Sequence, residues 1–177
     1  MPRLSVVDPA TTTGQVREIF DGPLKGKHLN IFKGLANSPA ALQAYLGLSG
    51  ALKDGLLTAA EREIIALQVG QSNDCGYCVA AHTVLGKMAG LSETQTVEAR
   101  LGKPSDPRHA ALARFVTALS EKRGFVDDAE IQTFREAGFS DGHVVEVIAN
   151  FALNTMTNYF NHVNDTEIDF PAPPTLN

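Results

Sequence analysis

The stretch TAAEREIIALQVGQSND, residues 58–74, most constrains the fold, because it carries the signals of an amphipathic helix from its first residue onward. Thr58 is followed three residues later by Glu61, the spacing of a capping box in which each side chain caps the other residue's backbone N–H. The apolar residues that follow recur at helical spacing: Ile64, Ile65, Leu67 and Val69. The sequence therefore predicts a helix here and explains Glu61 by capping.

Further segments show helical spacing of apolar residues and end at glycine, proline or a basic last turn. They are residues 14–21, 29–39, 40–55, 75–90, 92–102, 107–124, 127–139 and 140–163. No stretch alternates polar and apolar residues as a half-buried strand would. The pattern indicates the all-α class, with a compact multi-helix fold.

The chain of 177 residues is predicted to be a single helical domain. Residues 1–28 are expected to form an N-terminal arm, and residues 164–177 an irregular, proline-rich tail. The segment GKPSDPRH at residues 102–109 is the most loop-like internal stretch, but it is too short to mark a domain boundary.

A weak internal similarity appears when the chain is shifted by 83 residues. GLLTAAEREIIA at residues 55–66 then falls on GFSDGHVVEVIA at residues 138–149, and CGYC at residues 75–78 falls on NYFN at residues 158–161. Short matches of this kind also arise by chance between amphipathic helices. If the similarity is real, the chain contains two related helical pairs, of which the second lacks thiols and is mainly scaffold.

Charge and hydropathy exclude several classes of function. The net charge is -5, from 15 Lys and Arg against 20 Asp and Glu, and no basic cluster suggests a nucleic-acid partner. The first residues lack the apolar run of a signal peptide, and no run of about 18 apolar residues suggests a membrane span. We therefore expect a cytoplasmic location. In a reducing compartment, a closely spaced cysteine pair is more often redox-active or metal-binding than structural.

Both cysteines of the chain lie in DCGYCVAAH, residues 74–82. On a helix, Cys75, Cys78 and His82 share one face, because they are three and four residues apart. Cys75 lies near the predicted helix N-terminus, where free N–H groups and the helix dipole favour thiolate over thiol. His82 can accept a proton from a neighbouring thiol near neutral pH. The segment is thus typical of a thiol pair with a base in reach.

Glu63 adds a carboxylate to this group. It stands among aliphatic residues twelve positions before Cys75, and a carboxylate in such surroundings needs a partner. Helices joined by a short polar turn usually pack antiparallel, which would bring Glu63 beside His82 to orient the imidazole or relay its proton. The catalytic candidates are Glu63, Cys75, Cys78 and His82.

Metal binding is a weaker interpretation of the same residues. A structural zinc site needs four ligands, and no second CxxC or suitably spaced Cys and His group is present, although a catalytic zinc held by Cys75, Cys78 and His82 is left open. A polar helix end offers a second candidate group, formed by His162, Asp165 and Glu167. We expect no metal and no other cofactor.

EIIALQVGQSNDCGYCVAAH, residues 63–82, resembles the Glu-x11-Cys-x2-Cys-x3-His pattern of alkylhydroperoxidase D, in the carboxymuconolactone decarboxylase-like superfamily. NYFNHVNDTEIDFP at residues 158–171 is similar to the end of peroxidase-related members of that family. The resemblance covers most of the chain after about residue 40. It implies an all-helical AhpD-like fold, commonly assembled as a homo-oligomer such as a trimer or hexamer.

The resemblance also implies an activity, namely peroxide reduction by the cysteine pair with Glu63 and His82 as the proton relay. In the family scheme Cys78 attacks the peroxide and Cys75 resolves its sulfenic acid to a disulfide, whereas the helix terminus alone would activate Cys75. The implied partners are a hydroperoxide substrate and an external reductant, either a dithiol or a thiol or lipoylated protein. One departure is Tyr77, which replaces a histidine of the well-studied peroxidase.

Two other functions stay open at this point. The first is a cofactor-free decarboxylase or lactone-processing enzyme that uses Glu63 and His82 as acid and base and needs no thiol. The second is a non-enzymatic redox sensor that reports the oxidation of Cys75 and Cys78 to a partner. A purely structural cysteine pair is the plainest alternative, but a domain of this size does not need one in order to fold.

Overall fold

The computed structural model describes residues 1–176, and in this range it contains helices and no strands. The all-α class is therefore confirmed. The helices are α1 (Gly14–Asp21), α2 (Asn30–Leu35), α3 (Pro39–Lys53), α4 (Ala59–Ser72), α5 (Gly76–Met88), α6 (Glu93–Arg100), α7 (Pro107–Glu121), α8 (Asp128–Glu136) and α9 (Asp141–Asn164).

Most predicted helices lie within a few residues of the observed ones, and the largest difference is at α2. Within the predicted segment 29–39 the helix runs from Asn30 to Leu35, and the next helix begins at Pro39, one residue earlier than predicted. The Ser38 side chain accepts the N–H of Ala41 at 3.3 Å, and Pro39 occupies the first helical position, where its missing N–H costs nothing. A proline read as the end of one helix is thus the start of another.

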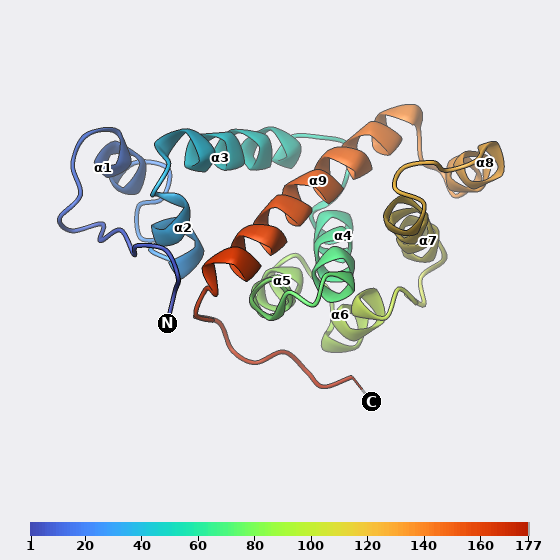
Figure 1. Ribbon diagram of the computed structural model, residues 1–177. Coiled ribbons are helices and arrows are strands. Elements are labelled where there is room, and N and C mark those ends of the chain that lie inside the picture. The colour runs from blue at the N-terminus through green and yellow to red at the C-terminus, as the bar shows by residue number, and fades with distance from the viewer. Residues whose placement is uncertain (177) are drawn as a thin grey trace.

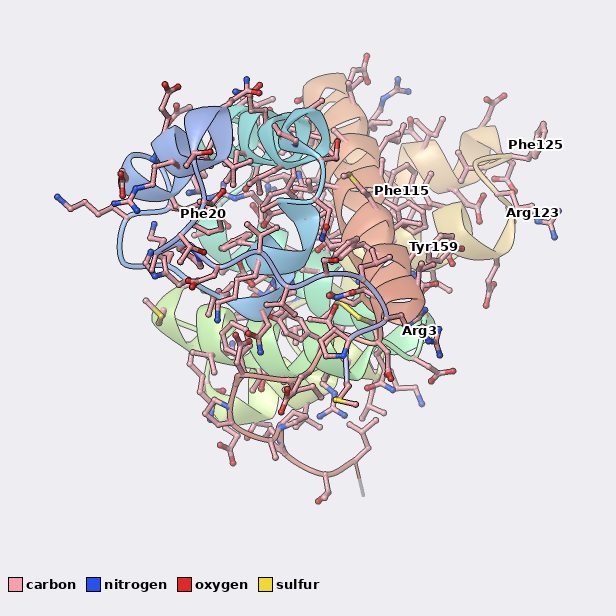
Figure 2. All side chains as sticks on the ribbon, turned by 60° about the vertical axis from the view of Figure 1, so that its left-hand side comes forward. Arg3, Phe20, Phe115, Arg123, Phe125 and Tyr159 are labelled. Atoms are coloured by element: carbon pink, nitrogen blue, oxygen red, sulfur yellow. A yellow bond between two sulfur atoms is a disulfide. The ribbon has the colours of Figure 1, made fainter. Side chains whose placement is uncertain are left out.

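Helix α4 is the centre of the molecule and packs against α5, α6, α7 and α9. Figure 1 shows the long helix α9 crossing the molecule diagonally, with α1 to α3 on one side of it and α7 and α8 on the other. Figure 2 shows Arg123 and Phe125 projecting outward from the turn between α7 and α8. Helix α4 therefore meets both α5, which carries the cysteines, and α9.

The buried side chains form two apolar clusters. One joins α4, α7, α8 and α9 and includes a stack of Phe115, Phe134 and Phe139. The other holds Cys75 and Cys78 together with residues of the N-terminal segment, namely Ile19, Phe20, Leu24, Ile31, Phe32 and Leu35. Residues 1–28, predicted as an arm, thus contain helix α1 and supply part of the apolar wall around the cysteines.

The predicted capping box of α4 is present. The Thr58 N–H donates to Glu61 Oε2 at 2.8 Å, and the Glu61 N–H donates to Thr58 Oγ1 at 3.2 Å. Arg108 Nε donates to Glu61 Oε1 at 2.7 Å. Burial raises the pKa of Glu61, but the hydrogen bonds from Thr58 and Arg108 outweigh it and hold the pKa below its usual value. Glu61 is therefore a structural carboxylate, as the sequence indicates.

The internal similarity relates α4 and α5 to a single helix, α9. The N-cap of α9 is Ser140 rather than Asp141, so the match of Thr58 with Asp141 is out of step by one residue. Glu146, the counterpart of Glu63, accepts the N–H groups of Leu56 and Leu57 instead of contacting a histidine. A turn separates α4 from α5 just before the cysteines, whereas α9 continues without a break through the matching positions.

The predicted tail over residues 164–177 begins at the last residue of α9 and is irregular as far as residue 176, while Asn177 lies outside the described residues. Its backbone runs beside the N-terminal half of the chain, since the Asn30 N–H donates to Asp169 Oδ2 at 2.7 Å. None of the helices within residues 1–176 has both the length and the apolar character that a membrane crossing requires.

Candidate active site

The cysteine pair lies at the start of α5, directly after the turn that ends α4. Asp74 adopts the left-handed conformation, with φ 53°, and Cys75 follows it as the N-cap residue. Cys75 and Cys78 are joined by a disulfide, with their Cα atoms 5.3 Å apart. Their residues are 1% and 3% exposed, so bulk solvent has little access to either sulfur.

Glu63 and His82 form a direct contact between α4 and α5. Glu63 Oε2 lies 2.7 Å from His82 Nδ1, and both side chains are partly buried. The predicted contact between the two residues is confirmed. A carboxylate on Nδ1 favours the tautomer that carries its proton there, which leaves Nε2 as a proton acceptor. The pair can therefore receive a proton on the side of the imidazole that faces away from Glu63.

A cavity of about 290 Å³ connects these groups. Cys78, His82 and Glu63 line it, whereas Cys75 does not. Other walls come from α2, α3, α9 and the tail: Ile31, Phe32, Tyr45, Leu52, Leu153 and Phe170. Of the two cysteines, Cys78 is therefore the one that a small molecule in this cavity can meet.

Asn161 on α9 also contacts the cysteines. Its Nδ2 donates to Cys78 Sγ at 3.3 Å and lies 4.0 Å from Cys75 Sγ. The amide is buried, and its Oδ1 has no hydrogen-bond partner within residues 1–176. Because an unpaired buried carbonyl oxygen costs about 1–3 kcal/mol, this atom is well placed to accept a hydrogen bond from a ligand in the cavity.

The sequence interpretation missed Asn161, although a signal for it exists. The shift of 83 residues sets Asn161 opposite Cys78, and the two residues prove to be in contact. The expectation that the second segment is mainly scaffold does not hold for this residue. Buried asparagines recur along the same side of α9: Asn150, Asn154, Asn158, Asn161 and Asn164.

Tyr77, between the two cysteines, ties the tail to the site. Its hydroxyl donates to Asp169 Oδ1 at 2.7 Å and accepts the Ile31 N–H at 3.4 Å. The ring of Phe170 meets the Tyr77 ring edge-on at 5.6 Å between centroids. Burial, and next the hydrogen bond to Asp169, raise the pKa of Tyr77 far above its usual range, so the phenol stays neutral. Tyr77 therefore anchors the chain that closes one end of the cavity.

Tyr45 is a further polar group in the cavity wall. Burial raises its pKa and outweighs the hydrogen bond with Ser49, which lowers it, while the negative charge of Glu63 adds to the increase. Like Tyr77, it is a neutral phenol at physiological pH. Glu63 and its partner His82 are therefore the remaining pair of ionisable groups in this part of the cavity.

The metal candidates find no support in the geometry. Over the range of residues that the structure describes, no three His, Cys, Asp or Glu side chains are close enough to hold an ion. The two cysteines and His82 do not form such a group, and neither do His162, Asp165 and Glu167. The two sulfurs are instead bonded to each other.

The comparison with protein families gives a match over residues 39–103, to the carboxymuconolactone decarboxylase family. All four catalytic candidates, Glu63, Cys75, Cys78 and His82, fall inside the matched segment. No curated protein sequence matches the chain.

Solved structures match over nearly the whole chain and confirm the AhpD-like fold. A peroxidase-related protein from Ralstonia eutropha JMP134, described as an alkylhydroperoxidase AhpD core, is 25% identical with a TM-score of 0.84, over 95% of this chain and 92% of that one. A peroxidase-related protein from Silicibacter sp. TM1040 is 20% identical with a TM-score of 0.79, over 93% and 89%. The debrominase Bmp8, as a cysteine-to-alanine variant with 2,3,4-tribromopyrrole bound, is 16% identical with a TM-score of 0.75, over 96% and 94%.

Proposed function

We propose that the protein is a thiol-dependent peroxidase that reduces organic hydroperoxides with Cys78 and Cys75. The observation that carries the proposal is the position of Cys78, which lines the cavity together with the paired Glu63 and His82. The match to the carboxymuconolactone decarboxylase family and the likeness to peroxidase-related structures support it at family level.

The first step oxidises Cys78. His82 takes the thiol proton at Nε2 while Glu63 holds Nδ1, and the Cys78 thiolate attacks the terminal oxygen of the hydroperoxide. The O–O bond breaks, the sulfur becomes a sulfenic acid, and His82 returns its proton to the departing alkoxide to give the alcohol. Asn161 Nδ2, which donates to Cys78 Sγ, would stabilise the thiolate before attack.

The second step forms the disulfide. The thiol of Cys75 condenses with the Cys78 sulfenic acid and releases water. An external dithiol then attacks Cys78, the cysteine that lines the cavity, and Cys75 leaves as a thiolate at the N-terminus of α5. The second thiol of the reductant resolves the mixed disulfide and restores both cysteines. The proposal places this cycle in the cytoplasm, where dithiols are available.

Peroxide consumption tests the proposal. Fully reduced protein should consume one equivalent of cumene hydroperoxide and form the Cys75–Cys78 disulfide, and it should turn over repeatedly when dithiothreitol or a lipoyl dithiol is supplied. Mass spectrometry after alkylation reports the state of both cysteines, and reduced protein without peroxide is the control. Two unmodified thiols after mild peroxide treatment would remove the peroxidase proposal.

The same measurements separate the two other functions. A lactone-processing or decarboxylating enzyme would use only the acid–base pair of Glu63 and His82, so a variant with serine in place of both cysteines would turn over a carboxylactone at the wild-type rate. A redox sensor would form the disulfide but show negligible turnover of peroxide with any dithiol, and its oxidation would change its assembly or its affinity for a partner.

We infer further that the protein assembles as a homo-oligomer, a trimer or a hexamer. The outer face of α9 carries an apolar stripe in which side chains are between 37% and 66% exposed: Val145, Ile148, Met156, Tyr159 and Val163. Figure 2 shows Tyr159 on this face. Apolar patches of this kind commonly mark protein interfaces. Sedimentation equilibrium should give a multiple of the monomer mass, reduced by Ile148→Glu, and a monomer at all concentrations would contradict the assembly.

A further inference from the structure

The cavity has a second end, opposite the cysteines. A Cβ on Gly70 would lie 3.4 Å from Cys78 Cβ, so Gly70 is the position on α4 that lies beside Cys78. Arg62, which also lines the cavity, lies eight residues earlier on the same helix. At about 1.5 Å per residue, this is a separation of roughly 12 Å along the helix axis. Lys53, in the last turn of α3, lines the cavity as well.

In the part of the chain that the structure describes, neither cation has an acidic partner. Within residues 1–176, no carboxylate forms an ion pair with Lys53 or Arg62. Arg62 Nη1 donates to the carbonyl oxygen of Leu57, which holds the guanidinium in place and leaves its other N–H groups without a recorded bond inside the same range. Arg62 is partly buried and Lys53 is exposed, so the two charges stand at the transition from cavity to solvent.

The charges of the cavity do not balance without a ligand. Glu63 is the carboxylate among the lining residues, and His82 already pairs with it. The remaining walls between the two ends are apolar or carry neutral amides and hydroxyls. A chain with a net charge of -5 therefore presents two unpaired cations at one end of an apolar cavity. An anionic group is the ligand that this end would bind, and a guanidinium is suited to a carboxylate, which it can hold with two parallel hydrogen bonds.

We propose that Lys53 and Arg62 form a carboxylate subsite, and that the substrates are organic hydroperoxides with a carboxylate at the end of a small apolar body. This inference rests on the proposed peroxidase function, because the hydroperoxide must reach Cys78 while the carboxylate is held near Arg62. The cavity volume of about 290 Å³ lies at the lower limit of ligand pockets, so a single ring or a chain of similar size fits and a phospholipid does not.

Binding of a probe without a peroxide tests the subsite independently of turnover. The probe is 4-isopropylbenzoate, and its uncharged match is 4-isopropylbenzamide, both measured by isothermal titration calorimetry on the full chain. We expect the benzoate to bind wild-type protein about tenfold more tightly than the amide, because one ionic contact of this kind is worth roughly that factor. The preference should shrink at high salt, because an exposed lysine contributes to it.

Variants locate the charge that the probe senses. Lys53→Gln and Arg62→Gln should each reduce the preference for the benzoate, and Arg62→Lys should retain part of it because the charge remains. Lys103→Gln and Arg114→Gln remove one cation each from exposed positions outside the cavity and should leave the preference unchanged. Equal binding of benzoate and amide to wild-type protein, or an unchanged preference in Lys53→Gln and Arg62→Gln, would overturn the subsite.

Kinetics with two hydroperoxides separate this inference from the peroxidase proposal. The pair is 4-(2-hydroperoxypropan-2-yl)benzoate and cumene hydroperoxide, compared by the ratio of their kcat/KM values. We expect the ratio to be about tenfold in wild-type protein and to fall toward one in Arg62→Gln. If both hydroperoxides react equally well and the benzoate binds no more tightly than the amide, the subsite is refuted and the peroxidase remains. If the benzoate binds through Lys53 and Arg62 but neither hydroperoxide oxidises the thiols, the peroxidase is refuted and the carboxylate subsite stands.

Discussion

Cys78→Ser should abolish peroxide reduction, with kcat/KM lower by on the order of 10³-fold or more, because serine lacks the nucleophilic thiolate on which the cycle depends. Cys75→Ser should behave differently. It retains Cys78, the cysteine that lines the cavity, but cannot form the intramolecular disulfide. We therefore expect it to consume about one equivalent of peroxide and then stop at the Cys78 sulfenic acid.

Stopped-flow measurement of peroxide loss, with dimedone trapping of the sulfenic acid, distinguishes the two variants. The two substitutions are matched, since each replaces one sulfur by oxygen in the same disulfide. The order of the cysteines is the point at issue, because the helix N-terminus taken alone favours Cys75 and the cavity lining favours Cys78. Dimedone labelling at Cys75 in the Cys78→Ser variant, with full consumption of one equivalent, would reverse the assignment.

His82→Gln should lower the rate of Cys78 oxidation by about 10²-fold, the usual contribution of a positioned acid–base group. Glu63→Gln keeps a hydrogen-bond acceptor beside His82 Nδ1 but removes the charge that supports a protonated imidazole, so its rate should also fall. Because the two side chains act as one unit, at 2.7 Å from each other, the double variant should be little slower than His82→Gln alone.

Single-turnover rates of thiol oxidation across a range of pH check the relay. A relay predicts that the pH profile changes shape in His82→Gln, which a loss of folding would not produce. His162→Gln and Glu121→Gln are matched controls at exposed positions outside the cavity and should retain the wild-type rate. Wild-type rates in His82→Gln at every pH would remove His82 and Glu63 from the mechanism.

The local features of the structure were accessible from the sequence because they depend on neighbours a few residues apart. The capping box at Thr58 and the helical face shared by the cysteines and His82 belong to this class. The contact of Glu63 with His82 was also predictable, since a short turn between two helices makes them pack antiparallel. The end of α2 was not, because a proline that can end one helix can equally begin the next.

The sequence alone indicated most of the helices, the capping box at Thr58 and the four catalytic candidates, through periodicity and short-range spacing. Only the tertiary structure decided which cysteine lines the cavity, that Asn161 donates to Cys78 Sγ, and that Tyr77 donates to Asp169 of the tail. It also decided that Lys53 and Arg62 share the cavity with Cys78. These contacts join residues far apart in the chain, and they arise from how whole helices pack against α4, which no local pattern specifies.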